Sequence, residues 1–413
     1  MTSLKSTQSL RICALSLLSF LIVGSYGLAR PCIDSLFLAH HSSQKLPLVW
    51  LYTVGFVALV IAIYNRFNTR YSLLKLLGIS SLLSASLLVL CLLSIPTSFK
   101  QEAVFALYIW KEVYMVLLIE IFWSFSDSTF NIKNARWAYG LLLGLGSFGG
   151  VLGNFFVGSL ASYYGTLHSL WFLLPIFFLC SLICKVFATT IDDAEVSTYP
   201  KTVPPFLQSF QTIRQSQYLF PLLLMVAVIQ IATTLIDFQF NTSLQIQIPS
   251  LDERTDLIGK THAIIDVISV ALQFFTGFIL RTVSVSGTLL SIPFLLATSL
   301  VLFMAFPRFL MVVVLKIASK CFDYSLFRAS KEILYIPLSH TEKTQGKALI
   351  DIFVYRLSKG FSSLLIMGLI AFEAASYVPA LTLGFLIIWT CLCYVIVKRY
   401  RSIVSLEEEF SGT

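Results

Sequence analysis

Charged side chains stand inside the longest apolar stretches of this sequence, where they could bind an anion or carry a proton. Arg30 and Asp34 are one helical turn apart. Lys316, Lys320 and Asp323 follow the i, i+4, i+7 spacing that places three side chains on one face of a helix. Because a charge at the centre of a bilayer is costly, each of these side chains is expected to face a cavity or a partner.

The charged candidates fall into two chemical groups. Arginine and lysine can hold an anionic substrate, and arginine can clamp a phosphate or carboxylate through two parallel hydrogen bonds. Carboxylates can balance that charge or relay a proton. The candidate substrate-binding residues are Arg30, Lys316, Lys320, Arg356 and Lys359. The candidates for charge balance or proton coupling are Asp34, Glu112, Glu120, Asp237, Asp323 and Asp351.

An alternative interpretation is that these residues form internal salt bridges with a structural role. The pairs would be Arg30 with Asp34, Lys316 or Lys320 with Asp323, and Asp351 with Arg356. However, the charged residues are spread over several apolar segments in both parts of the chain. This spread favours a polar cavity that crosses the protein over a few isolated pairs.

The composition is that of a membrane protein. Hydrophobic residues make up 57% of the 413 residues and charged residues 12%, against about a quarter in a soluble domain. The mean hydropathy of +0.84 excludes a soluble enzyme and leaves no room for a separate catalytic domain. Since one helical span takes about 20 apolar residues, the chain is long enough for about twelve spans.

Apolar runs that end at polar, charged or proline residues predict an all-α integral membrane protein with twelve transmembrane helices. We place these helices at 11–39, 46–65, 72–95, 102–130, 136–163, 167–190, 216–243, 257–280, 284–306, 307–330, 345–372 and 376–397. The first of them is too long, and too polar at its far end, for a cleaved signal peptide. We therefore expect it to stay in the protein.

The distribution of basic residues predicts the orientation, because lysine and arginine stay on the cytoplasmic side of a membrane. With the first residue inside, seventeen of the 29 lysines and arginines fall in or beside cytoplasmic segments and five fall outside. We therefore expect both termini in the cytoplasm and the protein in a cell (inner) membrane. The net charge of +8 then faces an anionic leaflet and requires no nucleic acid.

The chain is expected to consist of two six-helix halves. The longest polar stretch between spans, 191–215, carries three acidic residues and several prolines. It predicts a cytoplasmic linker between an N-terminal half, 1–190, and a C-terminal half, 216–413.

A weak internal repeat supports this division. Within 28–37, four residues recur 203 positions later in 231–240, and Asp34 falls on Asp237. The same offset places Glu120 of the fourth span on Asp323 of the tenth. Internal repeats with a binding site at their interface are typical of secondary transporters.

Small residues recur in the fifth span, at Gly140, Gly144, Gly146, Gly150 and Gly153. Gly144, Gly146 and Gly149 of the same span fit the pattern GxGxxG, but no strand precedes them, as a nucleotide-binding loop requires. Glycines at this spacing are typical of helices that pack closely. We therefore predict a close helix contact along this face.

The cysteines predict neither a disulfide framework nor a metal site. All eight lie in apolar stretches, and Cys391 and Cys393 would point to different faces of a helix. The five histidines are scattered and none is paired at a metal-ligand spacing. We expect no metal, no cofactor and no catalytic residue.

The segment 319–363 resembles the signature of the ATP/ADP carriers of plastids and intracellular bacteria. In that nucleotide transporter family the tenth helix ends in Tyr-Ser-Leu-Phe, followed by Lys-Glu and Tyr-Ile-Pro-Leu. The eleventh opens with Gly-Lys-Ala, Ile-Asp, Arg-Leu and a Lys. The matching residues here are Tyr324 to Phe327, Lys331, Glu332, Tyr335 to Leu338, Gly346 to Ala348, Ile350, Asp351, Arg356, Leu357 and Lys359.

The resemblance implies a twelve-helix fold of the major facilitator type that exchanges or imports nucleotides by alternating access. Glu112 and Asp237 keep the acids of the family. The chain departs from the family at Ile33, Asp323 and Asn241, where resembling members carry lysine. The loss of three cations points away from a triphosphate, toward a less charged nucleotide or another organic anion.

The leading hypothesis is a secondary active transporter of a nucleotide or nucleotide-like anion, working by exchange. A second hypothesis is a proton-coupled symporter of another small metabolite, with the acids as the proton relay. A third, a non-transporting membrane scaffold or membrane enzyme, has no motif in its favour. The expected partners are a small anionic substrate and membrane lipids, with the chain acting as a monomer. The substrate and the stoichiometry are left open by the sequence.

Overall fold

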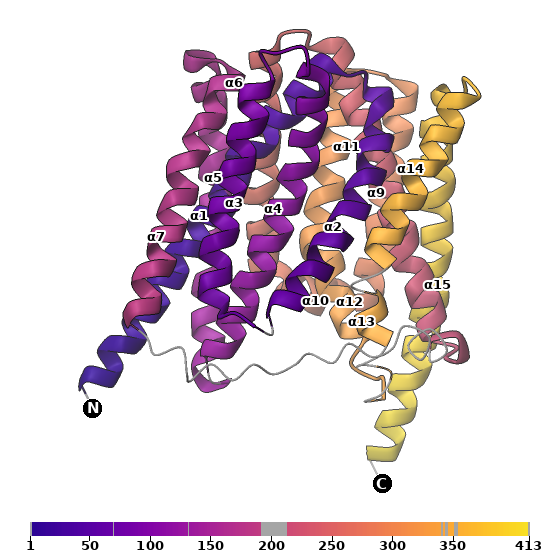
Figure 1. Ribbon diagram of the computed structural model, residues 1–413. Helices are drawn as coiled ribbons and strands as arrows, with labels where there is room; N and C mark the ends of the chain where they lie inside the picture. Colours follow the sequence, from indigo (N-terminus) through magenta and orange to yellow (C-terminus); the bar gives the residue numbers. More distant parts are fainter. Residues whose placement is uncertain are drawn as a thin grey trace. The chain divides into compact units, whose positions relative to one another are not determined.

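The computed structural model describes residues 2–68, 70–130, 132–190, 213–339, 342, 346–350 and 354–411. Within these ranges, helix is the only regular secondary structure (Figure 1). The all-α fold predicted from the apolar runs is therefore confirmed. Residues 191–212, which make up most of the predicted linker, lie outside the described ranges. The linker and the half boundaries at 190 and 216 stay predictions.

Eight helices of the described chain are long and apolar enough to cross a membrane. One of them, α10 (Leu251–Ala305), covers both spans predicted at 257–280 and 284–306. Ser284, with a φ of 66°, breaks the helical geometry between those two spans without a loop. The total of twelve spans stays a prediction.

The described chain forms two compact units. The first unit contains Gly55 onward of α2 (Leu46–Asn68) and residues 248–266 with the start of α10. Its other helices are α1 (Thr2–His40), α3 (Leu73–Ser94), α4 (Lys100–Thr129), α5 (Ile132–Tyr164), α6 (Thr166–Ser169) and α7 (Leu173–Thr190). Within this unit α1 packs along α5 and α4, and α3 packs along α4 and α7. At Gly165 a φ of 83° lets the chain turn from α5 into α6, a conformation that glycine adopts without strain.

Glycines allow α1 and α5 to approach each other very closely. A Cβ atom added at Gly149 would lie 2.3 Å from the carbonyl oxygen of Phe20, and one at Gly153 would lie 2.3 Å from that of Gly24. The predicted close contact is therefore confirmed at this end of α5, where Gly146 and Gly150 also contact side chains of α1.

The same prediction is wrong for Gly140 and Gly144, because an added Cβ atom there would meet open space. The reason is angular. At about 100° per residue, these two positions point roughly 120–160° away from the direction of Gly146. A spacing of four residues therefore did not place all five glycines on one face.

The second unit is built around α9 (Leu219–Gln247), which packs along α11, α14 and α15. It also holds Leu46–Val54 of α2 and α10 from Val267 onward. The other elements are α11 (Phe309–Phe322), a π turn (Asp323–Phe327), α12 (Arg328–Leu334), α13 (Lys347–Leu349), α14 (Tyr355–Ala371) and α15 (Val378–Ser411). Its core includes Trp389, which is 1% exposed and packs edge-on against Phe327 with ring centroids 5.8 Å apart. The tenth predicted span, 307–330, is thus a helix interrupted by one π turn.

Candidate functional site

In the first unit, α1 presents three polar residues at successive helical turns. Tyr26, Arg30 and Asp34 are four residues apart, so their side chains lie along one face of the helix. Pro31 lies inside the helix between the two charged residues and offers no N–H to the carbonyl of Gly27. The chain therefore carries a weakened turn at the point where it presents Arg30 and Asp34.

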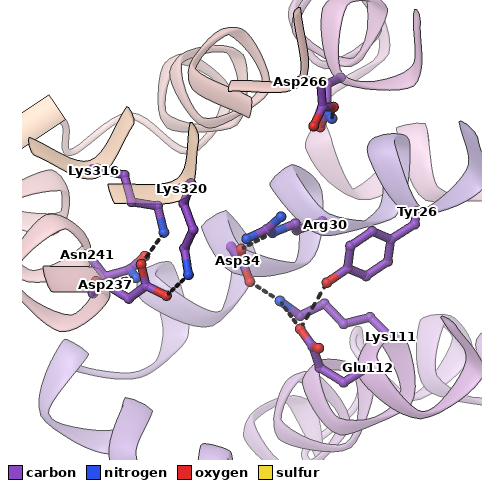
Figure 2. Close-up of polar contacts among 11 residues, drawn as sticks. Tyr26, Arg30, Asp34, Lys111, Glu112, Asp237, Asn241, Asp266, Lys316 and Lys320 are labelled. Carbon is purple, nitrogen blue, oxygen red and sulfur yellow. Dashed lines mark hydrogen bonds and ion pairs between the residues drawn. The ribbon is translucent and has the colours of Figure 1, made fainter. Parts of the chain in front are cut away.

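Lys111 of α4 is the centre of the charged group in the first unit (Figure 2). Its Nζ donates to Oδ1 of Asp34 and lies 3.4 Å from Oε1 of Glu112. The lysine side chain is 1% exposed, and its Nζ lies 3.9 Å from the centroid of the Tyr108 ring. A buried ammonium is stable only with such partners, so Lys111 fixes both carboxylates.

The outer members of this group are more exposed. The Nε atom of Arg30 lies 3.9 Å from Oδ2 of Asp34, and the guanidinium is 5.7 Å from the centroid of the Tyr26 ring. The Tyr26 hydroxyl donates to Oε1 of Glu112 over 3.2 Å. The Arg30 side chain keeps 21% of its surface exposed, against 1% for Lys111. Arg30 is therefore the cation of this group that a ligand can reach most readily, and its predicted pairing with Asp34 is confirmed.

In the second unit, Asp237 of α9 binds two lysines of α11 (Figure 2). Its Oδ1 accepts from Nζ of Lys316 over 2.5 Å, and its Oδ2 lies 3.0 Å from Nζ of Lys320. Nζ of Lys316 also lies 5.5 Å from the centroid of the Phe240 ring. Asn241 turns back on its own helix, where Nδ2 donates to the carbonyl oxygen of Asp237 over 2.7 Å.

The predicted salt bridge from Lys316 or Lys320 to Asp323 is wrong, because both lysines bind Asp237. Asp323 is the first residue of the π turn, which is wider than an α-helical turn and changes the direction in which its residues point. The i, i+4, i+7 rule assumes an uninterrupted α-helix. Asp323 is instead within electrostatic range of Lys320, Lys331 and Arg328.

The remaining predicted site residues are placed differently. Glu120 is exposed and lies about 12 Å along α4 from Glu112, so the structure does not bring it to the Lys111 group. Lys359 of α14 has its Nζ 5.9 Å from the centroid of the Trp50 ring. Arg356, on the first turn of α14, is half-buried. Asp351 lies outside the described residues, as does its predicted pairing with Arg356.

Sequence reasoning missed the role of Lys111 as the partner of Asp34. A signal for it was present, because Lys111 and Lys316 are 205 positions apart, close to the 203 positions that separate Asp34 from Asp237. The paired acids and the paired lysines therefore recur together. A search for cations near the repeat offset would have found the pairing.

The charged groups have the chemistry of a candidate anion site. In the described ranges of the chain, no group of three or more histidine, cysteine or acidic residues is placed so that it could hold a metal ion. The eight cysteines are free thiols, and five of them are buried, as expected for packing residues. In each unit one aspartate is held by a buried lysine and a second cation. An incoming anion can compete with that aspartate for the cations, which is the chemistry of reversible anion binding.

Residues 93–410 match the family model described as TLC ATP/ADP transporter. The chain is 28% identical over 310 residues to ADP,ATP carrier protein 1 of Chlamydia muridarum, which covers 64% of this chain and 58% of that protein. It is 27% identical over 227 residues to ADP,ATP carrier protein 1 of Chlamydia pneumoniae, which covers 49% and 44%. The chain therefore spans about half the length of the curated relatives it matches.

A solved structure of a bacterial homologue of the iron transporter ferroportin, in an inward-facing state, is similar in fold. The TM-score is 0.70 at 10% identity, over 95% of this chain and 99% of that chain. Similarity to structures of this kind confirms the major facilitator type of fold that the sequence predicted.

Proposed function

This chain belongs to the TLC ATP/ADP transporter family, and we propose that it exchanges nucleotides or nucleotide-like organic anions across a membrane by alternating access. The named relatives, called ADP,ATP carrier proteins, support a nucleotide cargo. The proposal is a transport step without covalent chemistry.

The observation that carries the proposal is the excess of positive charge around Asp237. Lys316 and Lys320 share this one carboxylate, so the three side chains together carry one positive charge. Asp323 lies within electrostatic range of Lys320, and also of Lys331 and Arg328. A net positive charge among apolar helices is costly unless an anion balances it. An anionic cargo supplies that balance.

This charge excess also favours exchange over one-way transport. A carrier that releases its anion keeps two lysines that share the carboxylate of Asp237, and moving this charge through an apolar barrier is unfavourable. A second anion that binds before the return step removes this cost. Counter-transport of one anion for another is then the favoured cycle.

The cargo is expected to carry less charge than a nucleoside triphosphate. Lysine is replaced at three positions where the family pattern has it, by Ile33, Asn241 and Asp323. Asn241 bonds to its own helix backbone, and Asp323 adds a negative charge near Lys320. A nucleoside monophosphate, a nucleoside diphosphate or another small organic anion fits this charge balance better.

We infer further that the protein spans a cell (inner) membrane as a monomer in contact with lipid, with both termini in the cytoplasm. The seventeen to five distribution of basic residues supports the orientation. The test is a reporter that is fused after Thr413 and works only in the cytoplasm, and we expect it to be active. If a reporter at this position is active only on the outer side of the membrane, the proposed orientation is wrong.

Transport by purified protein in liposomes tests the proposed function. Labelled ATP, ADP, AMP and small organic anions are offered outside, with and without the same compound inside. Uptake that requires internal counter-ligand and withstands an uncoupler is the expected result. Uptake without counter-ligand that collapses with the uncoupler would instead establish the proton-coupled symporter. No uptake of any nucleotide by folded protein would refute the proposal.

A matched pair of variants connects transport to the site. Lys316→Met removes the lysine that binds Asp237 over 2.5 Å and is 4% exposed. Lys260→Met removes a lysine that binds Asp256 over a similar 2.6 Å but is 58% exposed. Exchange is expected to be lost in the first variant and retained in the second.

A further inference from the structure

A second polar group in the first unit is not used by the proposed exchange site. Nδ2 of Asn154, on α5, donates to Oδ2 of Asp266, on α10, over 2.8 Å. Asn154 is 6% exposed, and Asp266 lies within the apolar part of α10. An ionisable residue in such a segment is a functional candidate by default.

The Asn154 amide has one polar atom that remains unsatisfied. Its Oδ1 is buried and accepts no hydrogen bond from the part of the chain that the structure describes. An ionised Asp266 is an acceptor and cannot donate to it. The two side chains therefore present more acceptors than donors, and one added proton would correct this imbalance.

An asparagine suits both charge states of the aspartate. When Asp266 is ionised, Nδ2 of Asn154 donates to it, as the structure shows. When Asp266 is neutral, a half-turn of the amide lets Oδ1 accept the carboxylic O–H. The buried Oδ1 would then gain a partner, and Nδ2 would give up Asp266 as its acceptor.

Arg30, a candidate anion-binding residue, lies within electrostatic range of this pair. Among the described groups around Asp266, α1 supplies the charge of Arg30, and α5 supplies the uncharged amide of Asn154. On α10 itself, His262 lies one turn earlier and is buried. The positive charge of Arg30 favours the ionised form of Asp266, whereas the burial of the carboxyl group opposes it.

We propose that Asp266 is a proton-binding site whose proton is taken up when an anion occupies Arg30. This inference rests on the proposed function, because it requires an anionic cargo at that arginine. The anion offsets the positive charge of Arg30, which favours the ionised form of Asp266, so the aspartate takes a proton from solution. When the anion leaves, Arg30 again favours the carboxylate and the proton is released.

Linkage between the two sites makes the proposal quantitative. If anion binding promotes protonation, protonation must strengthen anion binding by the same factor. For one fully coupled proton, the affinity falls by up to about tenfold for each unit rise in pH. Of two cargoes that differ by one negative charge, the more negative one would then be carried together with one proton bound at Asp266.

Calorimetry of the full-length protein in detergent tests the proposal, with ADP and AMP as the probes. The binding enthalpy is measured in buffers of different ionisation enthalpy, between about pH 5 and 8. The dependence on the buffer gives the number of protons taken up for each nucleotide bound. The wild type is expected to take up a substantial fraction of one proton, and its affinity is expected to fall as the pH rises.

Three variants separate the proton site from general effects. In Asp266→Asn the side chain at position 266 cannot ionise. The protons taken up for each nucleotide bound should then fall to the number that the phosphate groups of the nucleotide themselves take up. Asp266→Glu keeps the titrating group and is expected to keep the uptake. Asp256→Asn removes an acid at another position of α10 and is expected to behave as the wild type.

The outcomes distinguish the inference from the proposed function. Nucleotide binding by the wild type without net proton uptake at any pH tested overturns the inference and leaves the anion site intact. Equal uptake by the wild type and a folded Asp266→Asn also overturns it. If neither nucleotide binds to the folded wild type, the proposed function itself fails, and the inference fails with it.

Discussion

Replacement of Lys111 by methionine is expected to destabilise the protein strongly. Methionine fills a similar volume without charge, so Asp34 and Glu112 both lose the ammonium that lies between them. Removing one partner of a buried ion pair costs about 3–5 kcal/mol, because the remaining charge stays buried. Arg30 at 3.9 Å and the Tyr26 hydroxyl at 3.2 Å still reach the two carboxylates. We therefore expect a loss near the lower limit, about 3 kcal/mol.

Lys260→Met is the matched control for Lys111→Met. Both lysines bind an aspartate, and Nζ of Lys260 lies 2.6 Å from Oδ2 of Asp256. The Lys260 side chain is 58% exposed, however, so water already solvates both charges. Exposed pairs one helical turn apart contribute about 0.3–0.5 kcal/mol. The control should therefore lose several times less stability than Lys111→Met.

The assay is the free energy of unfolding in detergent, measured by denaturant titration. The proteins compared are Lys111→Met, Lys260→Met, Asp34→Asn and the double variant that combines Lys111→Met with Asp34→Asn. Since Lys111 and Asp34 are in contact, their effects should not add, with a coupling of about 2 kcal/mol. Similar losses for Lys111→Met and Lys260→Met would refute the reasoning, since burial would then make no difference. If the losses of stability caused by Lys111→Met and Asp34→Asn simply add in the double variant, the contact between Lys111 and Asp34 is refuted.

Three further predictions follow from the site and the packing. Asp323→Lys should shift the uptake ratio of nucleoside triphosphate to monophosphate toward the triphosphate, because it turns an anion near Lys320 into a cation; an unchanged ratio in active protein would place position 323 away from the cargo. Arg356→Ala should abolish transport with the protein still in the membrane. Arg356→Lys should restore little transport, because lysine lacks the planar guanidinium that can form two parallel hydrogen bonds. Normal uptake by the alanine variant would show that Arg356 is not part of the site. Gly153→Ala should destabilise the protein, since the new Cβ would lie 2.3 Å from a backbone oxygen of α1. Gly144→Ala should stabilise it by about 0.5–1 kcal/mol, because alanine favours the helix and the space is open; the opposite order in thermal unfolding would contradict the observed helix contact.

The sequence predicted the elements of the fold well, because membrane spans have a strong local signal. An apolar run of about 20 residues specifies a helix whatever its neighbours are. The limits of this signal are visible at Ser284, where a single residue of left-handed geometry replaces the expected break between two spans. They are visible again at the π turn of Asp323–Phe327, which no periodicity indicates.

The candidate site was predicted only in part, because ion pairs depend on which helices face each other. Arg30 and Asp34 lie on one helix, and their spacing alone predicted their pairing. Asp34 and Asp237 lie on other helices than the lysines Lys111 and Lys316 that bind them, so helical spacing does not identify these pairs. The only signal for them in the sequence is the similar repeat offset of the acids and the lysines. Helical spacing predicted the pair Arg30–Asp34 but not the lysines of Asp237, because a carboxylate on another helix can take the place of one on the same helix.

The two units pair their aspartates according to a common pattern. Asp34 and Asp237 are 203 positions apart, and the lysines that bind them, Lys111 and Lys316, are 205 positions apart. In both units the aspartate belongs to the helix that opens the candidate repeat, and the lysine is buried on another helix. Such agreement in pairing is stronger support for an internal duplication than four identical residues in ten.

The units differ in the origin of the second cation, and this difference has a mechanical consequence. In the first unit, Arg30 comes from the same helix as Asp34, so a separation of α1 from α4 would remove Lys111 from Asp34 but leave Arg30 beside it. In the second unit, Lys316 and Lys320 both come from α11, so separating α9 from α11 would remove both cations from Asp237 at once. Losing both partners of a buried carboxylate is the more costly event. If the anionic cargo binds the two lysines in place of Asp237, as we propose, it reduces this cost on the lysine side. We then expect the helix contacts of the second unit to respond most strongly to cargo.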